Sequence, residues 1–222
     1  MFEGRFGKAL TVALVVLIVV IIGILIFFTV DYIKNTKINN DAQNAADRFE
    51  GSVNGELKNE TQNTVQNTEI GNVEVNIKNE QVNGGSTSDN TFNGFPTVGT
   101  IEIPKTELKY PVLKDASKDA IEQSVAINGG PGLNKVGNTI IIGHNYRNGT
   151  FFSNNKNLSN GDKVYITDEK GTKLEYIIYN TYTTSPEDSG YMERDTEGKR
   201  EVTLVTCTDD TKSRLVIYAR ES

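Results

Sequence analysis

Three side chains in this sequence combine a nucleophile, a base and a fixed cation, and each stands where an apolar run meets a polar loop. Cys207 is the single cysteine and ends the run 203–207, and Arg214 begins the next run seven residues later. His144 is the single histidine and directly follows the apolar run 138–143. A nucleophilic thiolate needs a neighbouring base or cation, because a free thiol with a pKa of about 8.5 is mostly protonated near neutral pH. An arginine is always charged and can hold the oxyanion of an acyl-transfer intermediate, so the trio indicates thiol-dependent acyl transfer.

Each member of the trio also has an ordinary explanation. A lone cysteine is most often a buried structural thiol, a lone histidine can be a loop residue, and most arginines are solvated. A catalytic role requires strands that bring all three to one rim of a sheet or barrel.

The region from Thr97 onward has the pattern of an all-β domain that can do this. Short apolar or alternating runs recur with turn signals roughly every 8–12 residues, which is typical of a small barrel or sandwich. About 125 residues are enough for one closed core. The predicted strands are 98–104, 108–113, 138–143, 162–167, 172–182, 201–207 and 214–219. A short helix is predicted from Asp115 or Ser117 to Val125, a short helix or turn at 151–158, and loops at 128–132 and 183–200.

The pentapeptide Thr203-Leu204-Val205-Thr206-Cys207, with Arg214 after it and Gly143-His144 before it, resembles the signature of the sortases, the cysteine transpeptidases of bacterial surfaces. The resemblance covers roughly residues 98–222. It implies a mainly β fold, an eight-stranded sortase-type β-barrel with one or two short helices.

The resemblance also implies roles for the trio. Cys207 would attack a Leu-Pro-x-Thr-Gly-like sorting signal and form a thioester acyl-enzyme, His144 would act as general acid and base, and Arg214 would stabilise the oxyanion. The implied partners are surface proteins with a C-terminal sorting signal, and an amine nucleophile from a peptidoglycan precursor or another surface protein. Three residues are expected to line the substrate groove, although they could equally be ordinary core residues: Ile142, Val205 and Thr206.

This chemistry needs no cofactor. The acidic residues of the 183–200 loop could bind calcium, as in some sortases, but no ordered ligand spacing is present, and a solvated acidic loop is the preferred reading. The carboxylates concerned are Asp188, Glu193, Asp195 and Glu197.

The N-terminal part predicts a membrane anchor. Residues 10–30 carry no charge and are rich in Val, Ile and Leu, which is long enough to cross a bilayer core of about 30 Å. A secretory signal core is shorter, roughly 7–15 residues, and ends in a small-residue cleavage site, which is not evident here. We therefore expect three parts: 1–33 as a short cytoplasmic N-terminus and transmembrane anchor, 34–96 as a flexible Asn-rich extracellular tether, and 97–222 as the catalytic domain. Within the tether, Ala42, Ala45, Ala46 and Phe49 recur at a spacing compatible with a local helix that extends the membrane helix by a few turns. This makes the chain a single-pass cell-membrane protein with its catalytic domain outside, an orientation taken from the resemblance.

The net charge of −6 excludes a broadly basic nucleic-acid binder.

Two rival functions fit parts of the sequence. Another cysteine peptidase or hydrolase would pass the acyl group to water, although papain-like enzymes place Cys before His, the reverse of the order here. A non-enzymatic β-barrel module on a membrane tether would explain anchor and barrel but leave the trio to chance. The sortase subclass, the sorting motif and the acceptor stay open.

Overall fold

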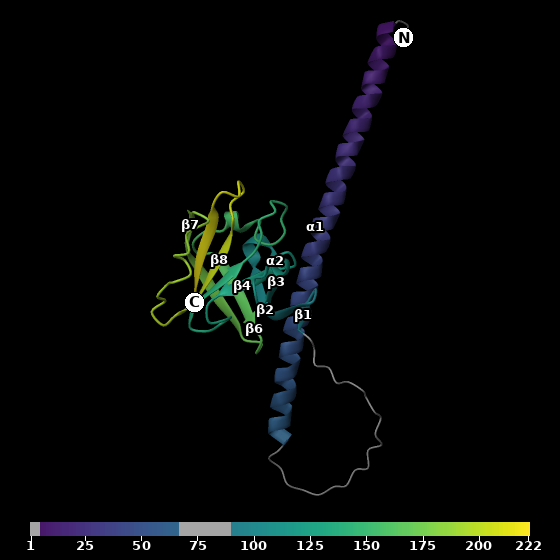
Figure 1. Ribbon diagram of the computed structural model, residues 1–222. Helices are drawn as coiled ribbons and strands as arrows, with labels where there is room; N and C mark the ends of the chain where they lie inside the picture. Colours follow the sequence, from purple (N-terminus) through teal and green to yellow (C-terminus); the bar gives the residue numbers. More distant parts are fainter. Residues whose placement is uncertain (1–4, 67–89) are drawn as a thin grey trace, which may run out of the picture.

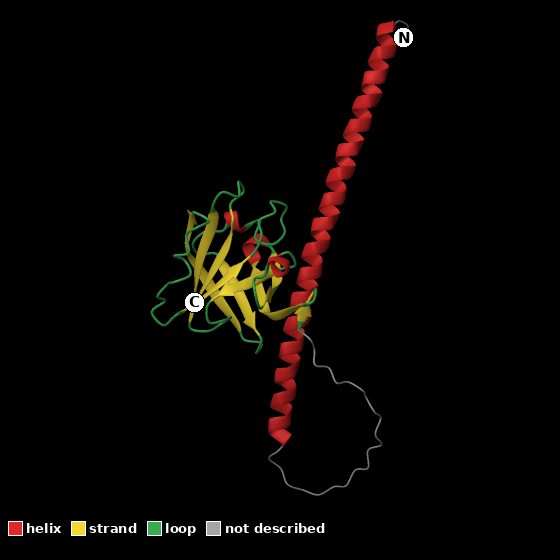
Figure 2. Ribbon diagram, viewed as in Figure 1, coloured by secondary structure: helices red, strands yellow, loops and turns green. Residues whose placement is uncertain are grey.

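The computed structural model describes residues 5–66 and 90–222 as a β-barrel lying against one long helix (Figures 1 and 2). The strands are β1 Thr91–Phe92, β2 Phe95–Ile103, β3 Leu108–Leu113, β4 Val125–Gly129, β5 Gly137–Ile142, β6 Lys163–Asp168, β7 Lys173–Thr184, β8 Arg200–Cys207 and β9 Arg214–Glu221. The helices are α1 Arg5–Gln66, α2 Lys118–Ile121 and the short 3-10 turns η1 Pro104–Thr106 and η2 Asn155–Asn157.

Eight strands close the barrel in the order β2-β3-β4-β5-β8-β9-β7-β6, and β6 pairs back with β2. This confirms the predicted eight-stranded barrel with few helices. The two-residue strand β1 only forms a small hairpin with β2. Two pairs of neighbouring strands are parallel, β3 with β4 and β5 with β8, and the other barrel pairs are antiparallel. The parallel pair β5–β8 brings together two strand ends that are far apart in the sequence.

The barrel core consists of the alternate side chains that point inward from each strand. Ile101 and Ile103 of β2, Ile141 of β5, Leu204 of β8 and Ile217 of β9 are completely or almost completely buried in it. Burial of a side chain of this size contributes about 1.5–3 kcal/mol, so this inner layer fixes the registers on which the site depends.

One local prediction between β3 and β5 is wrong. The helix begins as expected, with the Ser117 hydroxyl accepting a hydrogen bond of 3.2 Å from the Ala120 amide, but it ends at Ile121 instead of reaching Val125. Val125 starts β4, which pairs in parallel with Val112 of β3 and is fully buried. Pairing with strands on both sides stabilises this short segment, although its own sequence has only a weak strand pattern.

The long helix α1 differs from the expected flexible tether. The apolar span 10–30 is exposed throughout and is long and apolar enough to cross a membrane. The helix does not stop there but continues to Gln66, so residues 34–66 are helical, and residues 91–96 already belong to the hairpin β1–β2. The rest of the predicted tether, 67–89, lies outside the described residues. The boundary at Thr97 stays a prediction.

A stripe of small and aromatic side chains explains why α1 continues past the span. One helical face is buried against β2 and β3, and because its members recur every three or four residues they share that face. We call it the docking stripe: Ala42, Ala45, Ala46, Phe49 and Val53. Tertiary burial therefore stabilises a helix whose polar composition alone suggests disorder.

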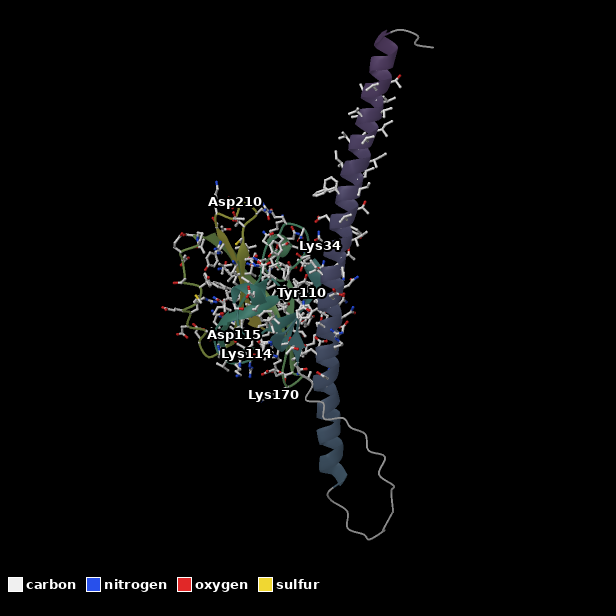
Figure 3. The ribbon with its side chains drawn as sticks, turned by 45° about the vertical axis from the view of Figure 1, so that its right-hand side comes forward. Lys34, Tyr110, Lys114, Asp115, Lys170 and Asp210 are labelled. Atoms are coloured by element: carbon white, nitrogen blue, oxygen red, sulfur yellow. The ribbon has the colours of Figure 1, made fainter. Side chains whose placement is uncertain are left out.

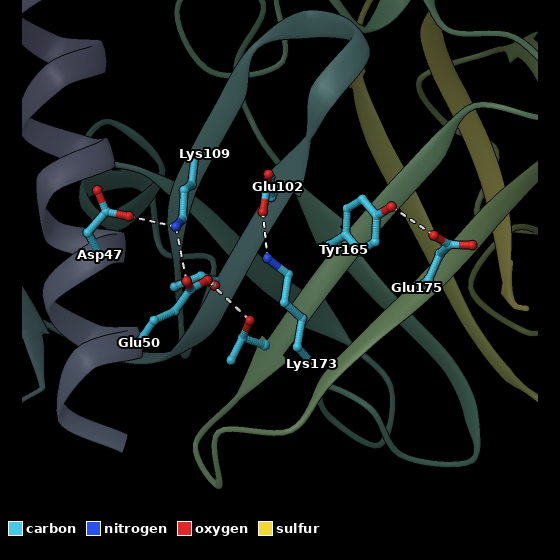
Figure 4. A network of polar contacts seen from close by, with 9 residues as sticks. Asp47, Glu50, Glu102, Lys109, Tyr165, Lys173 and Glu175 are labelled. Carbon is cyan, nitrogen blue, oxygen red and sulfur yellow. Dashed lines mark hydrogen bonds and ion pairs between the residues drawn. The ribbon is translucent and has the colours of Figure 1, made fainter. Parts of the chain in front are cut away.

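Charged side chains flank the docking stripe (Figure 4). The Lys109 ammonium of β3 lies 2.6 Å from Asp47 and 3.0 Å from Glu50, both on α1. The Thr100 hydroxyl donates a 2.6 Å hydrogen bond to Glu50. Burial acts to raise the pKa of Glu50, but the hydrogen bonds from Thr100 and Lys109 and the lysine charges outweigh it and hold this pKa below its ordinary value. Glu50 is therefore a carboxylate that ties α1 to the barrel.

Candidate active site

The parallel register of β5 and β8 brings His144 and Cys207 to the same rim of the barrel. Ile142 pairs with Val205, and His144 and Cys207 each stand two residues beyond this pair. The two chains stay joined past the last pair, because the Gly143 amide donates to the Val205 carbonyl at 3.2 Å. Strands that run in parallel end on the same side of a sheet, so the imidazole and the thiol come from neighbouring strand ends, as predicted.

Cys207 and Arg214 are brought together by the next pair of strands. They are the last register partners of the antiparallel hairpin β8–β9. Arg214 Nη1 lies 3.3 Å from Cys207 Sγ. The turn between them is closed by a 3.0 Å hydrogen bond from the Thr208 amide to the Ser213 carbonyl. The thiol is half-buried, and the guanidinium is its close cationic neighbour.

His144 has a close acidic neighbour that the sequence did not indicate. Its Nε2 lies 3.2 Å from Glu122 Oε1, just after α2. This Nε2 is buried and makes no well-aligned hydrogen bond within the described part of the chain. The imidazole also stacks on the Tyr146 ring, with centroids 4.8 Å apart and planes 27° apart, and meets the Phe151 ring edge-on at 6.4 Å. Two aromatic rings and a carboxylate therefore fix how the imidazole is oriented.

Tyr146 links this carboxylate to the ring that covers the imidazole. Its hydroxyl donates a short hydrogen bond to Glu122 Oε2. Burial, followed by the hydrogen bond and charge of Glu122, raises the pKa of Tyr146 to about 12. The phenol thus stays protonated at physiological pH and remains a donor to Glu122.

The loop that carries His144 is joined to the loop that follows Cys207. We call residues 144–152 the histidine loop and residues 208–213 the β8–β9 loop. Asn145 Nδ2 lies 2.9 Å from both the Cys207 carbonyl and Asp209 Oδ1, and Arg147 donates to the Asp209 carbonyl at 3.0 Å. An ion pair and hydrogen bond with Lys156, and then the hydrogen bond from Asn145, lower the pKa of Asp209. These contacts hold the imidazole and the thiol on one connected surface.

The three predicted groove residues divide between two faces of the barrel wall. Val205 and Ile142 pack together in a small apolar cluster separate from the main core, beside Tyr182 and Tyr191. The Thr206 hydroxyl instead donates to the Gly143 carbonyl at 2.7 Å and joins β8 to β5. The structure therefore brings Ile142 and Val205 together and leaves Thr206 as a strand-joining residue.

The β7–β8 loop, residues 185–199, is fastened over this apolar cluster by a buried carboxylate. The Glu201 side chain is fully buried and lies 2.9 Å from Arg194 Nη1 and 2.6 Å from Arg220 Nη2. The Arg194 guanidinium also lies over the Tyr218 ring, 3.7 Å from its centroid. The glutamate that directly precedes the buried run 202–206 was the sequence signal for this cluster, because buried charges need partners.

The acidic residues considered for calcium lie in the same loop. Asp188 accepts a 2.8 Å hydrogen bond from the Gly190 amide, and Asp195 accepts one of 2.8 Å from the Glu197 amide. Both carboxylates thus close local turns. Within residues 5–66 and 90–222, no three acidic, histidine or cysteine side chains are grouped as a metal would require.

Comparison with known proteins decides the family. A family model described as the sortase domain matches residues 101–222. This chain belongs to the sortase family. The matched region contains His144, Cys207 and Arg214. The resemblance seen in the pentapeptide is thereby confirmed.

Individual sortases agree with this membership. The chain is 32% identical to Sortase A of Bacillus anthracis over 124 residues, which are 54% of this chain and 57% of that protein. It is 28% identical to Sortase A of Streptococcus agalactiae over 134 residues, 57% of this chain and 53% of that protein. The chain thus spans little more than half the length of these curated relatives.

Solved sortases share the barrel. A lid mutant of sortase A from Corynebacterium diphtheriae has a TM-score of 0.53 and 26% identity, covering 58% of this chain and 71% of that one. A pilus-related sortase C of Group B Streptococcus has a TM-score of 0.52 and 26% identity, covering 57% of this chain and 67% of that one.

Proposed function

We propose that this sortase is a membrane-anchored cysteine transpeptidase that cleaves a Leu-Pro-x-Thr-Gly-like sorting signal and transfers the protein to an amine. The observation that carries the proposal is the 3.3 Å approach of Arg214 Nη1 to Cys207 Sγ. It occurs at the rim where the β5 strand end presents His144. A nucleophile, an acid–base group and an oxyanion donor are the parts that acyl transfer requires.

In the first half-reaction the Cys207 thiolate, whose proton has passed to His144, attacks the threonine carbonyl carbon of the signal. A carbon–sulfur bond forms, and the carbonyl oxygen becomes an oxyanion that accepts hydrogen bonds from Arg214. The carbon–nitrogen bond then breaks, and His144 gives a proton to the departing amine. The product is a thioester on Cys207 and a released C-terminal peptide.

In the second half-reaction an amine attacks the thioester carbon. His144 takes a proton from that amine, and the Cys207 thiolate leaves as the new amide forms. Glu122 faces the imidazole at 3.2 Å and keeps it oriented in both halves. Ile142 and Val205 provide an apolar wall for the signal beside the cysteine.

We propose residues 10–30 as the membrane anchor, with the N-terminus in the cytoplasm and the barrel outside. The support is the uncharged, exposed helix segment and family membership. The proposed partners are surface proteins with a C-terminal sorting signal, and an amine of a peptidoglycan precursor or another surface protein.

The test is an assay on the full chain in detergent or vesicles, with Leu-Pro-x-Thr-Gly-like peptides and a set of amine acceptors. Mass spectrometry should detect a thioester on Cys207 and a peptide–amine product, and Cys207→Ala should form neither. If only the hydrolysed peptide forms, even with amines in excess, the protein is a hydrolase. A chain that forms no adduct with any peptide, and whose cellular role survives alkylation of Cys207, would be a non-enzymatic module.

A further inference from the structure

The helix α1 touches the barrel at two separated levels, and the level nearer the apolar span belongs to the histidine loop. Asn148 Nδ2 donates to Asn35 Oδ1 at 3.0 Å. Asn39 Nδ2 donates to the Gly149 carbonyl at 3.4 Å. The first residues of α1 beyond the span therefore contact the loop that carries His144.

The second level lies at the opposite end of the barrel. Glu50 accepts hydrogen bonds from Thr100 at 2.6 Å and from Thr167 at 3.2 Å, next to the turn between β6 and β7. The Ser52 hydroxyl contacts Asn90 Oδ1 at 3.4 Å. Moving along α1 away from the span thus means moving from the Cys207–His144 rim to the far rim.

Helix geometry converts these levels into heights above a membrane. With the span ending at Val30, a rise of 1.5 Å per residue puts Asn35 about 8 Å and Glu50 about 30 Å beyond it along the axis. The polar headgroup layer adds about 5–8 Å on each side of the hydrocarbon core. A tilt of about 20° shortens these heights by only about one part in twenty. The histidine loop thus meets α1 at the outer edge of the headgroups.

The connection between span and barrel is stiff. Residues 31–34 are Asp-Tyr-Ile-Lys and helical, without the proline or glycine that allows a sharp kink. Further along the helix, the docking stripe is buried against the barrel. Asn39 accepts a short hydrogen bond from the Tyr110 hydroxyl, which accepts a 3.0 Å hydrogen bond from the Phe151 amide of the histidine loop. The direction of the span therefore sets the direction of the barrel.

We propose that α1 holds the barrel with its Cys207–His144 rim toward the bilayer, so that the histidine loop and the β8–β9 loop lie against lipid headgroups. The proposal rests on the anchor assigned under the proposed function. Figure 1 shows the β8–β9 loop on the span side of the barrel. In Figure 3 Asp210 lies toward the Lys34 end of the barrel, whereas Lys114, Asp115 and Lys170 lie at the far end.

One exposed aromatic side chain of the facing rim fits a headgroup surface. Among the described barrel residues, the exposed large apolar side chains are Val136 and Tyr146, and Tyr146 is in the histidine loop. Tyrosine is enriched at the membrane–water interface, where its ring and hydroxyl suit the headgroup layer. A substrate reaching this site would have to enter between the barrel and the membrane, so a membrane-inserted polypeptide would present its juxtamembrane residues directly to Cys207.

The test uses the full chain in phospholipid vesicles that carry a headgroup-attached quencher. In a Cys207→Ala background, single fluorophores are placed on Asp210→Cys and Lys170→Cys, two exposed loop positions at opposite ends of the barrel. We expect several-fold stronger quenching at position 210. Adding Lys34→Pro, which breaks α1 between span and barrel, should reduce quenching at 210 to the level at 170.

Two results would overturn the proposal, and they differ in meaning. Equal or stronger quenching at position 170, with the protein still bound to vesicles in carbonate, refutes the orientation and leaves the anchor intact. Loss of the protein from the vesicles in carbonate refutes the anchor as well. Circular dichroism of each labelled variant verifies that the barrel is folded, and because no step depends on turnover, the outcome is independent of the acyl-transfer proposal.

Discussion

The Arg214 guanidinium lies 3.3 Å from the Cys207 sulfur, across the final pair of the β8–β9 hairpin. Because a strand register sets this distance, it does not depend on a mobile loop. The hairpin is the structural reason why the two residues stand seven positions apart in the sequence.

Arg214→Lys should lower kcat/KM for peptide transfer about 10²–10³-fold, the cost of one lost oxyanion donor. Lysine keeps the charge but not the planar fork that holds sulfur and oxyanion together. Arg200→Lys, at the far rim, is the control and should leave the rate unchanged. Near-normal turnover of Arg214→Lys would remove Arg214 from the mechanism.

Glu122→Gln should lower kcat about tenfold with little change in KM, since general acid–base catalysis contributes roughly 10²–10⁴-fold and only the orientation of His144 is impaired. The same substitution should bring the pKa of Tyr146 down from about 12, because it removes a carboxylate that stabilises the protonated phenol. Phenolate absorbance over a pH series measures this, with Tyr146→Phe identifying the signal. An unchanged pKa for Tyr146 together with an unchanged kcat would contradict the role of Glu122.

Stability should decrease as the pH rises from 10 to 12. Burial raises the pKa of Tyr110 from 10.0 to about 12, so in this window the folded state keeps a proton that the unfolded state has lost. The contribution of Tyr110 to the free energy of unfolding is therefore fully present below pH 10, and it is lost as the pH rises through the pKa of Tyr110 in the folded state. Denaturant unfolding at several pH values should show a smaller decline for Tyr110→Phe, and an equally steep decline would rule out Tyr110 as a source.

Phe49→Ala should release α1 from the barrel, because the removed ring is buried in the docking stripe and such truncations cost about 3 kcal/mol or more. Hydrogen exchange of the amides in 35–53 should become faster, while the barrel strands keep their protection. Arg48→Ala, an exposed neighbour on the same helix, is the matched control. Equal exchange in the two variants would show that the stripe does not dock the helix.

Calcium should change neither the melting temperature nor the transfer rate. Asp188 and Asp195 already accept hydrogen bonds from nearby amides, and Arg194 fastens the loop to Glu201. A calcium titration with a magnesium series beside it checks this. A rise in melting temperature specific to calcium would place a cation in the loop.

The strand-end positions of Cys207, Arg214 and His144 were predictable, because the apolar runs before or after them are continuous and the loops between them are strongly polar. Strand β4 was missed because Val125–Gly129 is only five residues long, ends in Asn-Gly and depends on its neighbours for stability. The helical spacing of Ala42, Ala45, Ala46 and Phe49 is visible in the sequence, but the length of α1 was underestimated because the Asn-rich composition around them favoured a flexible tether. Glu122 could not be recognised, since only folding brings a carboxylate from the end of α2 to the imidazole.

The insertion of β8 between β5 and β9 has a consequence for biogenesis. β8 pairs with the earlier strand β5 on one side and with the later strand β9 on the other, so the thiol gains its guanidinium neighbour only when β9 pairs. Long-range pairing of this kind also folds slowly. Cys207 therefore lacks its Arg214 neighbour until β9 has joined the sheet, so the arrangement on which the proposed acyl transfer depends forms late in folding.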